Sequence, residues 1–351
     1  MKPPLERQAR REVAHRLQEL LEAPACASRS GGSESSRRVD AEIRVGDRVY
    51  LVEWKSSGDV AGVAAGVRQL AAQRNQERGE RVLLLAVPFM GEAGRRICRE
   101  SDVSWLDLSG NARIDAPGVH VRVEGKENRF KRRGRPSNPF APKSSRVARW
   151  LLLHPDEFHV QREMAIGIGM GDGFLSRVVR RLEELGLIER NEHGAVRARD
   201  PRLLLEAWAE TYDFERHHLL RGHVPARSGD ELFARLSSAL SSAGIEHAAT
   251  GLAGAWLLTH FAAFRTVTCY VSELPGADLL ESLGFHEDER DANLWLALPR
   301  DEGVFHGVKV KDGLPCAHPV QVWLDLKGHA ERASEAARHL EETLLDWRRR
   351  A

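Results

Sequence analysis

The sequence predicts a multidomain chain of the α+β class, with mixed α/β sheets at both ends and a group of short helices between them. Three observations predict this: an N-terminal hairpin pattern, three short amphipathic helices in the middle, and helices mixed with strands over the last third. With 351 residues, 42% of them hydrophobic, the chain can bury two or three cores of ordinary size. We expect domains at 1–125, 143–200 and 201–351, with a linker at 126–142.

The first element of interest is a β-hairpin. Residues 39–45 alternate apolar with polar side chains, residues 48–57 form a second strand, and Gly46-Asp47 is a two-residue loop of a favoured kind. In that register Asp40 lies directly opposite Glu53, with Cβ atoms roughly 5 Å apart. A three-residue turn would shift the register by one and separate the two acids.

The hairpin predicts one apolar face and one charged face. Two opposed carboxylates repel, and a divalent cation, Mg²⁺ by preference, would offset that repulsion. Lys55, about 7 Å along the strand from Glu53, could orient the attacking water or stabilise charge on a phosphate. The alternative is a solvated face without chemistry. The apolar face is expected to hold Val39, Ala41, Ile43, Tyr50, Val52 and Trp54.

This arrangement resembles the PD-(D/E)xK superfamily of restriction-endonuclease-like nucleases. Asp40 matches the first acid, Glu53 the second and Lys55 the lysine, while Val39 stands where Pro is usually written. The resemblance implies a restriction-endonuclease-like mixed sheet and Mg²⁺-dependent hydrolysis of phosphodiesters, with Asp40 and Glu53 as metal ligands. The flanking order also fits: a helix over 5–21, the hairpin, a helix over 60–76 and a buried strand over 81–87.

Other polar residues of the first domain are weaker candidates. Glu12 or Glu19 on the first helix could add a metal ligand, and Gln69 on the second helix could line the site. Asp107 and Asn111 flank a turn after a further strand. They either serve the backbone of that turn or add a contact to DNA or metal.

The linker and the start of the segment after it are strongly basic. Residues 126–149 hold nine Lys or Arg and one acid, a net charge of +8 in a chain whose total is +1. Within it, Arg133-Gly134-Arg135-Pro136 resembles the core of an AT-hook, which lays arginines such as Arg133 and Arg135 into A·T minor grooves. A solubilising linker is the alternative, and both versions attract phosphate in a salt-dependent way.

The middle of the chain predicts three helices and a hairpin. Helices over 145–154 and 159–168 are followed by a tight turn at Gly169–Gly171, and Asp172 is expected to cap the third helix. Strands over 187–190 and 195–199 form a wing. The apolar side of the third helix is formed by Leu175, Val178, Leu182 and Leu185.

This pattern resembles winged helix-turn-helix regulators, as does the phrase Leu-x-x-Leu-Gly-Leu-Ile-x-Arg at 182–190. The resemblance implies that the third helix enters the major groove of double-stranded DNA. Dimerisation or packing is the alternative use of the same fold. The expected DNA contacts are Ser176, Arg177, Arg180 and Arg181, together with Arg197 on the wing.

The last third is expected to contain helices near 203–212, 230–243, 251–261 and 330–348, and strands near 247–250, 266–271, 294–297 and 319–326. The phrases TGLAGA at 250, VTCYV at 267 and PVQVWLDL at 319, with the preceding winged helix, resemble the AbiEi family over residues 139–350 or so. That family supplies the antitoxin and autoregulator of a type IV toxin-antitoxin system. The resemblance implies a nucleotidyltransferase-like C-terminal domain.

The residues of that domain do not supply nucleotidyl transfer. The reaction needs a Gly-Ser turn for phosphates and two or three acids for metals. Here Thr250-Gly251 replaces the turn, 266–271 contains no acid, and Asp325 alone cannot hold two cations. We therefore expect a non-catalytic domain, with His217, His218 and the run 286–289 as solvated surface.

The remaining composition favours a cytoplasmic protein without a membrane partner. The cysteines at 26, 98, 269 and 316 form no metal-binding pair, which indicates a reducing compartment. The apolar stretch 251–264 is too short to span a bilayer, and the charged N-terminal helix is unlike a signal peptide.

Three hypotheses follow. The chain is a DNA-binding regulator whose first domain still cleaves nucleic acid, or a regulator whose nuclease fold only grips DNA or dimerises, or an antitoxin whose main partner is a cognate toxin. The intact Asp40, Glu53 and Lys55 favour the first, and the near-neutral charge favours the third. A homodimer is compatible with each of them.

Overall fold

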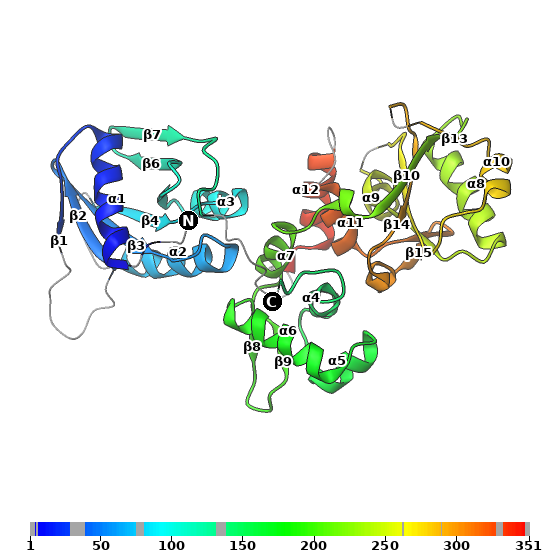
Figure 1. Ribbon diagram of the computed structural model, residues 1–351, viewed down its shortest axis with the longest axis horizontal. Helices are drawn as coiled ribbons and strands as arrows, with labels where there is room; N and C mark the ends of the chain where they lie inside the picture. The colour runs from blue at the N-terminus through cyan, green and yellow to red at the C-terminus, as the bar shows by residue number, and fades with distance from the viewer. Residues whose placement is uncertain are drawn as a thin grey trace. The chain divides into compact units, whose positions relative to one another are not determined.

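The computed structural model describes residues 4, 6–28, 39–74, 81–130, 138–261, 263–288, 290–327 and 333–347. The chain divides into two compact units, Met1–Ser137 (unit 1) and Asn138–Ala351 (unit 2) (Figure 1). Across the described ranges, no helix combines the length and the apolar content needed to cross a bilayer.

Unit 1 is built on a seven-stranded mixed sheet whose strand order follows the chain, β1 to β7. The three central strands, β3, β4 and β5, are parallel, and the outer strands pair antiparallel with them and with one another. In chain order the elements are α1 (Glu6–Leu21), β1 (Ala25–Ser28), β2 (Ala41–Val45), β3 (Arg48–Trp54), α2 (Val60–Arg74), β4 (Arg81–Val87), α3 (Glu92–Glu100), β5 (Ser104–Asp107), β6 (Ala112–Ala116) and β7 (Val119–Val123).

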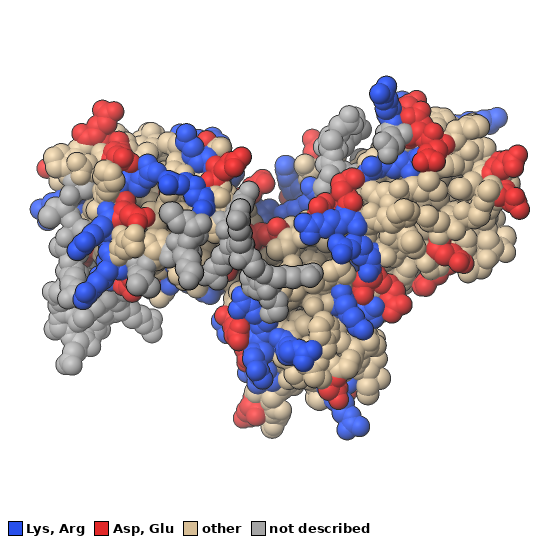
Figure 2. All heavy atoms as spheres, viewed as in Figure 1, with Lys and Arg blue, Asp and Glu red and all other residues tan. Residues whose placement is uncertain are grey.

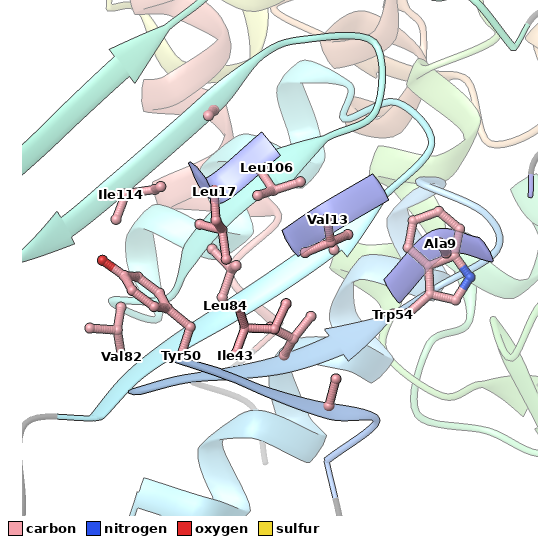
Figure 3. Close-up of a cluster of buried hydrophobic side chains, with 14 of the residues drawn as sticks. Ala9, Val13, Leu17, Ile43, Tyr50, Trp54, Val82, Leu84, Leu106 and Ile114 are labelled. Carbon is pink, nitrogen blue, oxygen red and sulfur yellow. The ribbon is translucent and has the colours of Figure 1, made fainter. Parts of the chain in front are cut away.

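Helices cover both faces of this sheet. On one face α1 packs through Ala9, Val13 and Leu17 onto apolar side chains of β2 to β6 (Figure 3). On the other face α2 and α3 pack onto a second cluster that includes Leu85 and Trp105. Because the central strands are parallel, all three end at one edge of the sheet, called here the carboxyl edge.

The hairpin has the predicted register over its paired residues, but the pairing ends at Ala41 and Val52 and does not include Asp40 and Glu53. Ile43 pairs with Tyr50 and Ala41 with Val52, and the loop glycine Gly46 has φ +58°. The strand β2 begins only at Ala41. The side chains of the residues before it therefore do not continue the strand's alternation between the two faces of the sheet. Val39, expected on the α1 face, instead packs in the α2 cluster, and that expectation was wrong.

Unit 2 begins with what we call the three-helix segment: α4 (Ser145–Leu153), α5 (Gln161–Gly167), α6 (Asp172–Glu184), β8 (Ile188–Arg190) and β9 (Val196–Ala198). His159 pairs with Val196 through backbone bonds of 2.8 and 2.9 Å, which delays the start of α5. The N-cap of α6 is Gly171 rather than Asp172, which lies in the first helical turn without a capping bond. The capping prediction was therefore wrong.

The rest of unit 2, residues 201–347, is called here the C-terminal part. Its seven-stranded sheet has the order β13-β10-β14-β12-β11-β16-β15. Helix α8 covers one face, while α9 lies on the other face with α11 and α12 (Figure 1). The elements are α7 (Pro201–Ala209), η1 (Phe214–Arg216), β10 (His218–His223), α8 (Gly229–Ser242), β11 (His247–Thr250), α9 (Gly251–Thr259), β12 (Val267–Val271), α10 (Ala277–Ser282), β13 (His286–Glu287), β14 (Leu294–Leu298), η2 (Glu302–Phe305), β15 (Lys309–Lys311), β16 (Leu314–Cys316), α11 (Pro319–Leu326) and α12 (Ala333–Leu344).

One expected strand of the C-terminal part is a helix. Residues 319–326 form α11, with Pro319 in its first turn and His318 Nδ1 accepting from the backbone N–H of Val320 at 3.2 Å. Every residue from Val320 to Leu326 is buried. A short helix buried on all sides has no polar face, so its sequence pattern does not distinguish it from a buried strand.

Candidate nucleic-acid interface and carboxylate cluster

The predicted catalytic residues of unit 1 gather at the carboxyl edge, in what we call the carboxylate cluster (Asp40, Glu53, Lys55 and Gln69). Lys55 Nζ donates to Glu53 Oε1 at 2.7 Å and also to the side-chain oxygen of Gln69 on α2. Asp40 lies just before β2, and its Oδ2 accepts from the backbone N–H of Trp54 at 2.8 Å. Gln69 therefore lines the cluster, as expected.

A glycine on α2 makes room for the lysine. A Cβ at Gly66 would lie 2.5 Å from Leu85 Cδ1 and 3.3 Å from Lys55 Cγ. Both contacts are tighter than ordinary packing, so any larger side chain would displace the helix or the aliphatic stem of Lys55. The sequence of α2 thus helps to hold the ammonium group beside Glu53.

Burial dominates the electrostatics of Glu53, whose residue surface is 3% exposed. Desolvation raises the pKa of Glu53, the hydrogen bond from Lys55 lowers it, and the negative charges of Asp40 and Glu6 raise it further. A carboxylate in this setting is stabilised by an added positive charge.

Glu6 was missed by the sequence reasoning. Glu6, Glu12 and Glu19 each hydrogen-bond to another residue of α1, but of the three it is Glu6 whose charge raises the pKa of Glu53. Glu6 precedes Ala9 by three residues, so it continues the stripe of α1 that faces the sheet. That spacing is the signal that could have identified it.

The cluster holds few metal ligands of its own. Across the described residues, no group of three or more His, Cys, Asp or Glu side chains could hold a metal ion. One oxygen each of Asp40 and Glu53 is bonded to the chain, and the other has no donor among the described residues. These donors fit Mg²⁺ only where substrate phosphate and water complete its coordination, which is a usual arrangement for that ion.

Asp107 and Asn111 serve the backbone. Asp107 accepts from the backbone N–H groups of Met90, Gly110 and Asn111 at 3.1, 2.8 and 2.9 Å, and from the Asn111 side chain at 2.9 Å. Asn111 in turn bonds both backbone groups of Lys126. Both residues close the turn after β5, which was the simpler of the two interpretations.

The outer face of α6 has the arginines that the sequence predicted. Leu175, Val178, Val179 and Leu182 are buried, whereas Ser176, Arg177 and Arg180 are exposed. Leu185, expected in the core, is only partly buried.

These arginines differ in their partners. Arg180 makes no hydrogen bond or ion pair with any described residue. The Arg177 guanidinium lies 5.6 Å from the centre of the Phe174 ring. Arg181 pairs with Glu184 at 3.0 Å. Arg177 and Arg180 are therefore the side chains of α6 most available for a polyanion.

The β8–β9 hairpin has fewer arginines without an ion-pair partner among the described residues. Arg197 Nε bonds Glu189 Oε1 at 2.7 Å, and its guanidinium lies 4.4 Å from the centre of the Phe158 ring. Basic side chains nevertheless gather on the face that carries α6 and β8 (Figure 2). Arg133 and Arg135 lie outside the described residues.

Thr250, which the sequence analysis placed where a phosphate-binding turn would lie, belongs to a buried polar network in the C-terminal part. Asp325 on α11 accepts hydrogen bonds from the hydroxyls of Thr250, Tyr212 and Tyr270 (3.0 Å from the last), and from Gln321 Nε2 at 2.7 Å. Burial raises the pKa of Asp325 to about 6, against the effect of these bonds. The network therefore engages Asp325, the acid that the sequence left as a candidate metal ligand of this domain, with four donors of the chain itself.

His217 belongs to the edge of this network rather than to the solvated surface. Its Nε2 shares a hydrogen bond with Tyr212 Oη at 3.1 Å. Burial, with the nearby charges of Arg300 and Arg149, lowers the pKa of His217 to about 4. The sequence interpretation of His217 was wrong, while that of His218, which is exposed, is confirmed.

Arg149 of α4 links the three-helix segment to the network. Its Nη2 donates to Gln321 Oε1 at 2.5 Å, and its guanidinium lies 5.0 Å from the centre of the Trp208 ring. Burial lowers the pKa of Arg149. The carboxylate of Asp325, reached through Gln321, supplies a counter-charge.

Comparison with known protein families gives one match, over part of the chain. Residues 197–346 match the family described as "Transcriptional regulator, AbiEi antitoxin, Type IV TA system". The match begins within β9 and covers most of the C-terminal part, but not unit 1 or the helices of the three-helix segment. No curated protein and no solved structure matches the chain.

Proposed function

We propose that this protein is a DNA-binding transcriptional regulator of the AbiEi antitoxin kind, and that α6 reads duplex DNA in the manner of a winged helix-turn-helix protein. The family match over residues 197–346 supports the regulator class. The observation that carries the DNA-binding role is the exposed face of α6, where Arg177 and Arg180 are free of ion pairs to described residues.

The chemistry of that face suits a major groove. Arginine can donate two parallel hydrogen bonds to the edge of guanine, and a neighbouring arginine or serine can grip phosphate. Arg180 and Ser176 are four residues apart on α6, so they lie on one side of the helix. Arg181 and Arg197, which are ion-paired within the chain, are assigned to weaker phosphate contacts.

The partners follow from the same proposal. An antitoxin implies a cognate toxin protein, and a winged-helix regulator implies a homodimer on paired half-sites in the cytoplasm. The charged linker, with Arg133 and Arg135, adds affinity for phosphate without sequence information.

Selection from a randomised duplex library by the full-length protein tests the DNA-binding role. We expect enrichment of one sequence, bound by mobility shift with an affinity that falls as salt rises. Recovery of an unselected mixture, bound no better than the starting library, would contradict the proposal.

A second candidate function is supported by the carboxylate cluster of unit 1: nucleic-acid cleavage. The bond from the Trp54 backbone that holds Asp40 near Glu53, the adjacent Lys55 and the raised pKa of Glu53 favour it. Mg²⁺ held by Asp40 and Glu53 would supply an activated water and shield phosphate charge. Lys55, whose ammonium already donates to Glu53 and Gln69, would have a third proton to donate to a phosphate oxygen.

Substitution of Glu53 tests the cleavage activity. Incubation with labelled duplex and single-stranded DNA should give cleavage by the unchanged protein with Mg²⁺, and none with EDTA or with Glu53→Gln, which keeps the buried shape but removes the charge. Glu12→Gln, at a half-buried glutamate of α1 that bonds Gln8, is the matched control and should cleave normally. Equal cleavage by both variants would reveal a contaminating nuclease, and no cleavage by the unchanged protein would leave unit 1 as a scaffold.

A further inference from the structure

A second arginine of α4, Arg146, holds two parts of unit 2 together. Its Nε and Nη2 donate to the two carboxylate oxygens of Asp301 at 2.7 and 2.8 Å, and Nη2 also lies 3.1 Å from Glu302 Oε1. Its Nη1 donates to the backbone oxygen of Ile168 at 3.0 Å. The side chains of Arg146 and Asp301 are 8% and 14% exposed, so this contact is shielded from water and salt.

The two groups that Arg146 binds, Ile168 O and the Asp301 carboxylate, belong to different parts of unit 2. Ile168 ends α5 and opens the turn that leads into α6, and the next residue, Gly169, has φ +61°. Asp301 caps η2 in the C-terminal part, where its Oδ1 also accepts from the backbone N–H of Gly303 at 2.9 Å. The guanidinium of Arg146 therefore connects the turn before α6 to the carboxylate of Asp301. That carboxylate is itself held by the backbone N–H of Gly303.

We propose that Arg146 is a positioning residue, through which residues 301–305 of the C-terminal part set the placement of α6 for DNA. This inference rests on the proposed DNA-binding role of α6. On this inference the C-terminal part controls DNA affinity through the placement of α6. Two parallel hydrogen bonds of this kind require a guanidinium and a carboxylate. An asparagine at position 301 therefore keeps the shape of the side chain but loses the ion pair and one of the two bonds from Arg146.

Asp301→Asn tests the inference in the full-length protein. We expect affinity for the selected duplex to fall roughly tenfold, with affinity for a scrambled duplex and the salt dependence unchanged, because no phosphate contact is removed. Asp278→Asn, an exposed aspartate on α10 with no partner among the described residues, is the matched control and should bind as the unchanged protein does.

A second measurement does not depend on DNA. In Asp301→Asn the amide of Met170, which donates to Ala165 O at 2.9 Å within the turn, should exchange hydrogen faster, while amides inside α8 should not change. A general loss of folding would affect both. This measurement shows whether the turn before α6 depends on Asp301 in a folded protein.

The outcomes separate the two proposals. Suppose that loss of the α6 arginines weakens DNA binding, but that Asp301→Asn prefers the selected duplex over the scrambled duplex by the same factor as the unchanged protein. The positioning role of Arg146 is then overturned and the DNA-binding role stands. If the α6 arginines prove irrelevant to DNA binding, both proposals fall.

Discussion

Replacement of both Arg177 and Arg180 by alanine is expected to lower the affinity for the selected duplex about a hundredfold. Each well-placed arginine contributes roughly 1–3 kcal/mol to recognition of the correct base or phosphate. Both side chains lie on the exposed face of α6, so neither substitution removes core packing. The stability of the protein should therefore change little.

Titration of labelled duplex followed by fluorescence anisotropy measures this effect. Arg338→Ala is the matched control, because Arg338 is an exposed arginine of another helix, α12, with no partner among the described residues. The control should bind normally. Unchanged affinity of the double variant would reject α6 as the DNA-reading helix.

Asp325→Ala is expected to have the largest effect on stability, lowering the free energy of unfolding of unit 2 by about 3–5 kcal/mol. The substitution leaves the hydroxyls of Thr250, Tyr212 and Tyr270 and the amide of Gln321 without their buried acceptor. It also removes the counter-charge of Arg149, which is fully buried.

Equilibrium unfolding in urea, followed by tryptophan fluorescence, measures the loss. Six of the eight tryptophans belong to unit 2, so the signal reports mainly on that unit. Asp278→Ala, at an exposed position, should stay within about 0.5 kcal/mol of the unchanged protein. A comparable loss of unfolding free energy in both variants would show that the buried network around Asp325 does not contribute the stability expected of it.

The N-terminal hairpin was predictable because its information is local. The alternation of residues 41–45 and 48–54 and the length of the loop fix the register of the paired residues, which runs from Ala41 opposite Val52 to Val45 opposite Arg48. Asp40 was harder to place. It lies before the first paired residue of β2, so its position depends on the bond to the Trp54 backbone rather than on strand geometry.

The C-terminal part was less predictable because some of its elements, α11 above all, are buried on every side. The segment 319–326 has the composition of a buried strand, yet the capping residue before Pro319 and its packing against α9 and α12 make it a helix. The sequence did not predict the strands β10, β13, β15 and β16. Three of them, β13, β15 and β16, are short, and most of their residues are exposed or partly buried.

The contacts of α4 could not have been predicted at all. Arg146 and Asp301 are 155 positions apart, and nothing in the local pattern around either residue indicates its partner. The same holds for Arg149 and Gln321, which are separated by 172 positions. Such pairs are specified by the packing of whole elements.

Amide hydrogen exchange of the full-length protein, with and without the selected duplex, is the most direct test of the claim that α6 is the DNA-binding surface. The account predicts slower exchange over Asp172–Glu184 on addition of DNA, and no change over Gly229–Ser242, a helix of similar length in the C-terminal part. Protection elsewhere in the chain that leaves Asp172–Glu184 unchanged would contradict it.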